Sequence, residues 1–248
     1  MRFLSPEETL AFAGPEAIAP GEIHVWAVCL TGSVAARARC TELLEPEERE
    51  RAARFYSQDG HDAFTFAHGQ LRHLLARYCG VEGSALRFCH GEHGKPQLAV
   101  GQWLDKRVFF NLTHSAGRAL VAISANLELG IDLEAHERRT DVLRIADRYF
   151  FGSEAEMIRA APEADRRALF FFLWTAKEAV IKAQGGGLSV PLDAFRVVPL
   201  QDRLARVETF DTSHVDTGWF VHLLPCAQGW SAALAAKSEA PVVRVLGK

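Results

Sequence analysis

Three carboxylates and two lysines lie in two short segments of the chain, at spacings that could bring them to one point. Asp132 and Glu134 are two residues apart, so on a strand they point to the same side. Glu178 and Lys182 are four residues apart, so on a helix they share a face, with Lys177 beside them. If the two segments meet, hard oxygen ligands surround a basic group. That arrangement suits a divalent cation shared with a phosphate-bearing substrate.

The strand segment also has an ordinary structural interpretation. Asp132 and Glu134 can be the outward residues of a half-exposed strand whose Ile131 and Leu133 point inward. Against this, acidic residues are poor strand formers. Two carboxylates at one site also raise each other's pKa unless a cation compensates them. The strand pattern alone leaves both interpretations open.

The helical segment favours a functional interpretation more strongly. An exposed ion pair of Glu178 and Lys182 would contribute only ~0.3–0.5 kcal/mol. Phe171, Trp174 and Ile181 flank the same polar face, however, and a solvated face rarely carries three such large apolar residues. We therefore predict that this face is covered. The opposite face carries an apolar stripe at helical spacing: Leu169, Leu173, Ala176, Val180 and Ala183.

Other basic and hydroxyl-bearing residues could bind a phosphate group. Arg51 and Arg54 lie about one helical turn apart and could grip a phosphate, or could be surface charge. Lys95–Pro96 follow Gly94 in a short turn, which alone is an ordinary turn. Thr113–His114 lie at a predicted strand end, where ligand sites commonly gather, although a lone histidine there is more often structural.

The motifs of several other chemistries are missing. The cluster Cys89–His93 has no second pair of ligands, whereas zinc sites need three or four at recognisable spacing. The chain has no GxSxG nucleophile elbow, Walker loop or Rossmann glycine fingerprint. The glycines 185–187 follow a predicted helix and so end it, where a phosphate-binding loop would open one.

Composition is that of an ordinary globular protein. The 248 residues are 48% hydrophobic and 24% charged, enough for one large domain or two. A formal net charge of -3 does not point to nucleic acid. No stretch is long and apolar enough for a membrane span or a signal peptide. Five scattered cysteines indicate reduced thiols. We expect a cytoplasmic protein without nucleic-acid or membrane partners.

The predicted elements alternate in an order that repeats once. Strand, helices and strands are followed by strand, helices and strands, which predicts an α+β fold with two halves that meet near residues 116–126. The expected elements are an irregular lead-in (1–21), a strand (22–30), helices (34–44, 46–54 and 62–79), a strand (108–112), a hairpin (119–124 with 127–134), a helical block (142–184) and short strands within 193–246.

Four motifs resemble those of one enzyme family in their order along the chain. GKP (94–96), FNLTHS (110–115), GIDLE (130–134) and WTAKEAVIK (174–182) are similar to motifs of 4′-phosphopantetheinyl transferases. The resemblance is to the larger, pseudo-dimeric class typified by the surfactin-synthetase enzyme. It covers most of the chain, because residues 44–72 also resemble the N-terminal helices of that class.

This resemblance implies a fold of two similar halves related by a pseudo-twofold. Each half would hold a small, three-stranded antiparallel sheet and a long helix, with the active site in the cleft between them. The half 1–120 would contact the phosphates and adenine of coenzyme A. The half 121–248 would carry the metal-binding carboxylates and the helix motif. A monomer is expected.

The resemblance also implies a reaction. The 4′-phosphopantetheine arm of coenzyme A would pass, with Mg²⁺, to a serine of an apo acyl or peptidyl carrier protein, releasing adenosine 3′,5′-bisphosphate. Asp132, Glu134 and Glu178 would bind the metal. Glu178, Lys182 and Asp132 would be catalytic, with Glu178 as the base and Lys182 at the leaving group. The implied coenzyme contacts are Arg51, Arg54, Lys95, Pro96, Thr113, His114, Lys177 and Lys182.

Two departures from the family pattern and two alternatives remain. Thr113 replaces the more common serine and keeps the hydroxyl, whereas the segment 57–64 has fewer basic residues than many relatives, which leaves part of the 3′-phosphate grip unassigned. One alternative is another Mg-dependent phosphohydrolase on the same carboxylates. The other is a non-catalytic carrier-protein binder, against which the three intact carboxylates argue.

Overall fold

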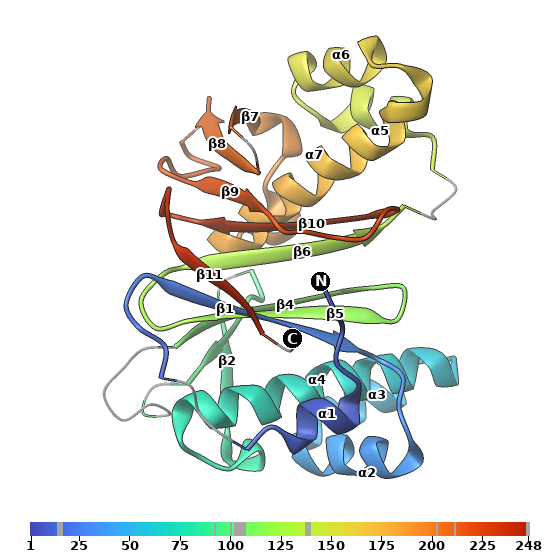
Figure 1. Ribbon diagram of the computed structural model, residues 1–248, viewed down its shortest axis with the longest axis vertical. Helices are drawn as coiled ribbons and strands as arrows, with labels where there is room; N and C mark the ends of the chain where they lie inside the picture. The colour runs from blue at the N-terminus through green and yellow to red at the C-terminus, as the bar shows by residue number, and fades with distance from the viewer. Residues whose placement is uncertain are drawn as a thin grey trace. The chain divides into compact units, whose positions relative to one another are not determined.

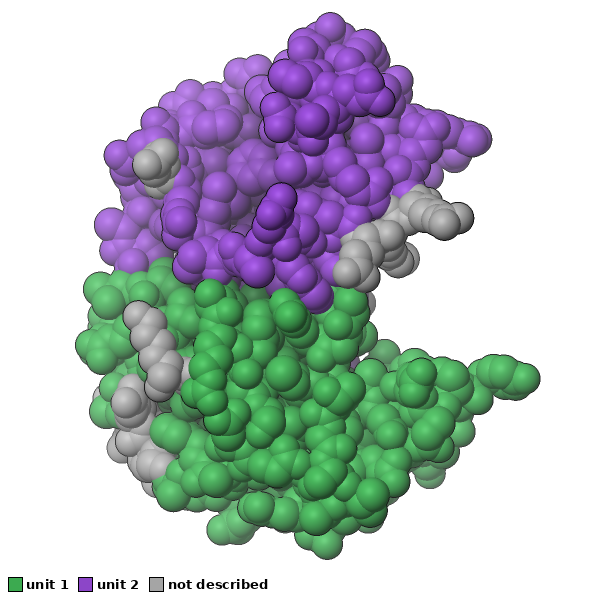
Figure 2. Space-filling model, turned by 45° about the vertical axis from the view of Figure 1, so that its right-hand side comes forward, with its two compact units in different colours: residues 1–89, 97–126, 242–248 green, residues 90–96, 127–241 purple. Residues whose placement is uncertain are grey.

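The structure is a computed structural model that describes residues 1–13, 17–91, 93–99, 101, 108–136, 140–201, 203–210 and 212–246 (Figure 1). The chain forms two compact units, coloured separately in Figure 2. Unit 1 comprises Met1–Cys89, Gln97–Asn126 and Val242–Lys248, and unit 2 comprises His90–Pro96 and Leu127–Pro241. Both units are mixtures of helices and sheet, so the predicted α+β class is confirmed.

The sheet of unit 1 has four strands in the order β11-β1-β5-β4, one more than the three expected. Its members are β1 (Glu22–Cys29), β4 (Phe109–Ser115), β5 (Arg118–Ser124) and β11 (Val242–Leu246). β1 pairs antiparallel with β5 and parallel with β11. The last strand of the chain therefore belongs to unit 1, not to the half 121–248.

Unit 1 contains four helices within the described residues: α1 (Pro6–Ala11), α2 (Val34–Leu43), α3 (Pro46–Ala53) and α4 (Gln58–Cys79). α1 corrects the expected irregular lead-in, because Ser5 and Glu8 form a capping box there. α4 begins before the predicted residue 62, since the Ser57 hydroxyl accepts from the Gly60 N–H and caps the helix. Gly80 ends α4 with φ 69°, as predicted. A short 3₁₀ turn (Gly83–Ala85) and the hairpin β2 (Phe88–His90) and β3 (Pro96–Leu98) follow.

A fully buried arginine fixes α3 onto α4. Arg72 Nε lies 2.5 Å from Glu48 Oε2, and its Nη2 lies 2.5 Å from Glu45 Oε2. Its Nη1 donates to the main-chain oxygens of Gly83 and Leu86. This network anchors the helix that contains Arg51 and that ends at its C-cap, Arg54.

Unit 2 has an antiparallel sheet of five strands in the order β6-β10-β9-β8-β7. The expected hairpin of 119–124 with 127–134 is wrong, because β5 and β6 lie in different sheets. Both edges of β5 are already paired, with β1 and β4, so β6 pairs with β10 instead. The strands are β6 (Leu129–Ala135), β7 (Phe195–Gln201), β8 (Leu204–Thr209), β9 (Phe220–Leu223) and β10 (Trp230–Ala236).

The predicted helical block of unit 2 is three helices: α5 (Val142–Tyr149), α6 (Gly152–Ala160) and α7 (Glu163–Gln184). Pro162 separates α6 from α7, because proline fits a helix start and not its interior. α7 packs along β6 and β10 (Figure 1), and Gly185 ends it with φ 78°. Two 3₁₀ turns, Gly187–Ser189 and Leu192–Ala194, lead into β7. Within the described residues no helix could cross a membrane.

Candidate functional site

The candidate site of unit 2 starts from a close approach of β6 to α7. A Cβ atom added to Gly130 would lie 2.2 Å from both the Ala179 carbonyl oxygen and the Ala183 amide nitrogen. Only glycine therefore fits at this position of β6. Asp132 and Glu134 follow at two-residue spacing and so point to the same side of the strand as that contact.

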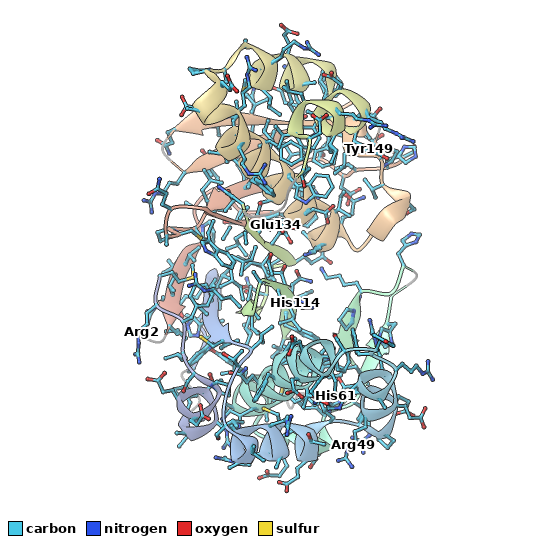
Figure 3. All side chains as sticks on the ribbon, turned by 90° about the vertical axis from the view of Figure 1, so that its right-hand side faces the viewer. Arg2, Arg49, His61, His114, Glu134 and Tyr149 are labelled. Carbon is cyan, nitrogen blue, oxygen red and sulfur yellow. The ribbon has the colours of Figure 1, made fainter. Side chains whose placement is uncertain are left out.

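The two segments singled out in the sequence meet on this face. Lys182 Nζ of α7 lies 2.5 Å from Asp132 Oδ1 of β6, and the Asp132 side chain is buried. Burial raises the pKa of the Glu178 carboxyl, and the charges of Asp132 and Glu134 raise it further, while Lys182 lowers it. Glu134 is labelled on β6 in Figure 3. We call these four residues the carboxylate cluster.

The apolar residues that flank Glu178 and Lys182 are buried or partly buried, so this side of α7 is not fully solvated. Phe171 and Ile181 are 3% and 6% exposed, and Trp174 packs partly buried against the core of unit 2. The shielding lowers the local dielectric constant around the carboxylate cluster, so charge–charge interactions there are stronger than on an open surface. Glu178 and Lys182 are therefore not an ordinary solvated ion pair.

The donor chemistry of the carboxylate cluster fits a hard divalent cation bound in an open site. Burial and the charges of two neighbouring carboxylates raise the pKa of Glu178, and a cation between such groups stabilises their charged forms. Mg²⁺ usually takes one or two protein carboxylates and completes its shell with water and substrate phosphate. Among the described residues, no group of three or more His, Cys, Asp or Glu side chains could hold a metal ion by itself. In the Cys89–His93 cluster, Glu92 lies outside the described residues.

Lys95 lies in unit 2 and joins the GKP turn to α7. Its Nζ donates to the Ala183 carbonyl at 2.6 Å, in the last turn of α7, and to the Leu129 carbonyl at 3.0 Å, where β6 begins. Burial lowers the pKa of Lys95 to about 8, although the charge of Glu128 raises it in part. Pro96 follows as the first residue of β3 and is partly buried.

This lowered pKa predicts how Lys95 affects stability as the pH changes. In the unfolded chain a lysine titrates near pH 10.4. Between about pH 8 and that value the unfolded chain binds more protons than the folded protein, so stability rises with pH. The free energy of unfolding of the wild type minus that of Lys95→Met should therefore increase from pH 8 to pH 10, by at most about 1.4 kcal/mol per pH unit.

Urea unfolding at four pH values measures this difference. Lys237→Met removes an exposed lysine and serves as the matched control. A difference that stays flat or falls as the pH rises contradicts the buried, carbonyl-bound state of Lys95.

Lys177, a predicted coenzyme contact, lies in the core of unit 2. Its side chain is 0% exposed and pairs with Glu154 of α6. Glu154 was not identified from the sequence, because its segment Gly152–Ala160 looks like a charged surface helix. Gly130 carries a signal that could have been used, since glycine inside a strand marks a close approach.

The remaining predicted site residues belong to unit 1. Thr113 is buried and His114 is exposed near the end of β4, where Figure 3 labels His114. Arg51 is exposed, with its Cζ 5.4 Å from the Phe64 ring centroid. Arg54 is exposed and lies 3.9 Å from Glu50.

Comparisons with known proteins find similar sequences within one enzyme family. Residues 128–235 match the family model described as the 4′-phosphopantetheinyl transferase superfamily. The chain is 34% identical over 168 residues to the 4′-phosphopantetheinyl transferase HetI of Nostoc sp., covering 68% of this chain and 70% of that protein. It is 32% identical over 174 residues to the 4′-phosphopantetheinyl transferase Sfp of Bacillus subtilis, covering 70% and 75%.

Proposed function

We propose that this chain, which belongs to the 4′-phosphopantetheinyl transferase superfamily, transfers the 4′-phosphopantetheine arm of coenzyme A to a serine of an apo acyl or peptidyl carrier protein. The observation that carries the proposal is the carboxylate cluster with its lysine, which lies inside the segment matched by the family model. The other product would be adenosine 3′,5′-bisphosphate.

The residues of the cluster have the properties that such a transfer needs. The carrier serine would attack the β-phosphorus of coenzyme A, so the enzyme requires no nucleophile of its own. The raised pKa of Glu178 makes it a better proton acceptor than an ordinary carboxylate, and we assign it as the base for the serine hydroxyl. The Lys182 side chain is 30% exposed, so its ammonium can reach the bisphosphate leaving group.

We further propose that Asp132, Glu134 and Glu178 hold Mg²⁺. The bound ion would neutralise the charge of the pyrophosphate, which phosphoryl-transfer chemistry requires. The support is the donor set itself: three carboxylates, of which Glu178 has a pKa raised by burial and by the charges of the other two.

The coenzyme contacts implied by the resemblance are part of the proposal. Arg51, Arg54 and His114 are exposed side chains that can approach a phosphate, and Thr113 and Pro96 complete the proposed set of coenzyme contacts. Lys95 would contribute through the position of its turn, since its ammonium already binds two carbonyls. We expect the protein to act as a monomer.

A direct assay tests the function. The protein is incubated with coenzyme A, Mg²⁺ and a panel of apo carrier proteins, and each carrier is examined by mass spectrometry. We expect the mass of the phosphopantetheine adduct on the carrier serine. If no carrier gains the adduct while nucleotides lose phosphate without a carrier, the protein is a phosphohydrolase. If carriers bind without modification, it is a non-catalytic binder.

A further inference from the structure

Lys177 precedes Glu178 in the chain, yet its side chain serves a different part of unit 2. Its Nζ lies 2.7 Å from Glu154 Oε2 and donates to the main-chain oxygens of Leu192, at 2.8 Å, and Phe195, at 2.6 Å. A lysine ammonium has three N–H donors. All three therefore have partners inside the protein, in a side chain that is 0% exposed.

Both carboxylate oxygens of Glu154 also accept hydrogen bonds inside unit 2. Its Oε1 accepts from the Val197 N–H at 2.8 Å, and its Oε2 accepts from the Phe151 N–H at 3.2 Å as well as from Lys177. The carboxylate thus binds the N-terminus of α6, β7 and α7 at once. The Lys177–Glu154 pair is the point where these three elements are joined.

Aromatic rings complete the enclosure of the ammonium. Lys177 Nζ lies 4.3 Å from the ring centroid of Phe195 and 5.7 Å from that of Phe150. Such contacts favour a cation and fix its place. A buried ion pair is often no more stabilising than apolar residues of the same volume, so its best physical justification is that it specifies one arrangement.

We infer that Lys177 is a positioning residue for the transfer reaction, which acts through Glu154 by fixing the rotation of α7 about its axis. Consecutive helix residues point about 100° apart. A rotation that moved Lys177 away from Glu154 would turn Glu178 and Lys182 away from Asp132 by the same angle. The contact at Gly130 sets how closely α7 approaches β6. The Lys177–Glu154 pair sets which side chains of α7 face β6.

This inference rests on the proposed function and differs from a coenzyme contact in what it predicts. A lysine that touches coenzyme A affects the KM for coenzyme A, and a change at Glu154 leaves that KM alone. A positioning pair affects kcat, and the decrease in kcat is the same whether Lys177 or Glu154 is changed. A purely structural pair affects stability while the kcat of the folded enzyme is unchanged.

Three variants separate these outcomes: Lys177→Met, Glu154→Gln and the double variant. Lys177→Met leaves a buried carboxylate unpaired and should melt about 10 °C below the wild type. The double variant removes both charges and should recover most of that shift. All three are assayed well below their melting temperatures. We expect kcat to fall at least about ten-fold in each, since a small misplacement of catalytic groups is costly, with the KM for coenzyme A unchanged.

Amide hydrogen exchange of residues 178–184 provides a readout that does not depend on activity. Exchange in this segment should be faster in the double variant than in the wild type, although their melting temperatures are similar. The inference is overturned if the double variant keeps the wild-type kcat. It is also overturned if Lys177→Met alone differs from the wild type and the difference lies in the KM for coenzyme A. A wild-type protein that modifies no carrier refutes the proposed function instead, and unchanged exchange of 178–184 would then refute the positioning role separately.

Discussion

Glu178→Gln should lower kcat for carrier modification at least about 100-fold, which corresponds to about 2.7 kcal/mol of transition-state stabilisation. The amide has nearly the same shape as the carboxylate but cannot accept the serine proton. Carrier modification at saturating coenzyme A and Mg²⁺, followed by mass spectrometry, measures the effect.

The loss in Glu178→Gln should not come from unfolding. Burial and two neighbouring carboxylates raise the pKa of Glu178, so its charged form is disfavoured in the folded protein relative to the unfolded chain. At neutral pH this carboxylate therefore lowers the stability, and the neutral glutamine should leave the melting temperature equal or higher. Glu156→Gln, at an exposed glutamate of α6, is the matched control and should keep full activity.

Asp132→Ala should likewise abolish transfer, for a second reason. The substitution removes a proposed metal ligand. It also removes the ion-pair partner of Lys182, whose Nζ lies 2.5 Å from Asp132 Oδ1. Wild-type-like kcat in both Glu178→Gln and Asp132→Ala would remove the assignment of the carboxylate cluster as the catalytic site.

The spacing of residues predicted which side chains of each segment share a face, and the carboxylate cluster forms because the two segments meet. Two-residue spacing on a strand and four-residue spacing on a helix restrict side-chain direction tightly, so Glu178 and Lys182 could be predicted to share a face. That this face meets Asp132 was implied by the family resemblance. The covering of the helix followed from Phe171 and Ile181 for the same reason. Local periodicity carries such information because it does not depend on which distant segments pair.

Pairing between distant segments could not be predicted from the same periodicity. β5 and β6 are close in sequence and both alternate like strands, yet β5 is already paired on both edges and β6 joins β10. Lys177 and Lys95 show the same limit at the level of side chains. Each has the charge of a phosphate ligand. The three-dimensional structure reveals that Lys177 pairs with Glu154 and that Lys95 donates to main-chain carbonyls.

Gly130→Ala should destabilise the protein by about 3 kcal/mol or more and should also abolish transfer. The added methyl group would lie 2.2 Å from main-chain atoms of Ala179 and Ala183, which cannot rotate away as a flexible side chain can. α7 must therefore move off β6, which separates Glu178 and Lys182 from Asp132. A shift of about 1 Å in catalytic groups can cost about 100-fold in rate.

Gly152→Ala is the matched control for the same chemical change. Gly152 lies in α6 without a positive φ, and a Cβ atom there meets no atom within 4 Å. Its stability should stay within about 0.5 kcal/mol of the wild type, since alanine is the better helix former. Urea unfolding and carrier modification are measured for both variants. If Gly130→Ala unfolds at the same urea concentration as Gly152→Ala and modifies carriers equally fast, β6 and α7 do not approach as closely as the site requires.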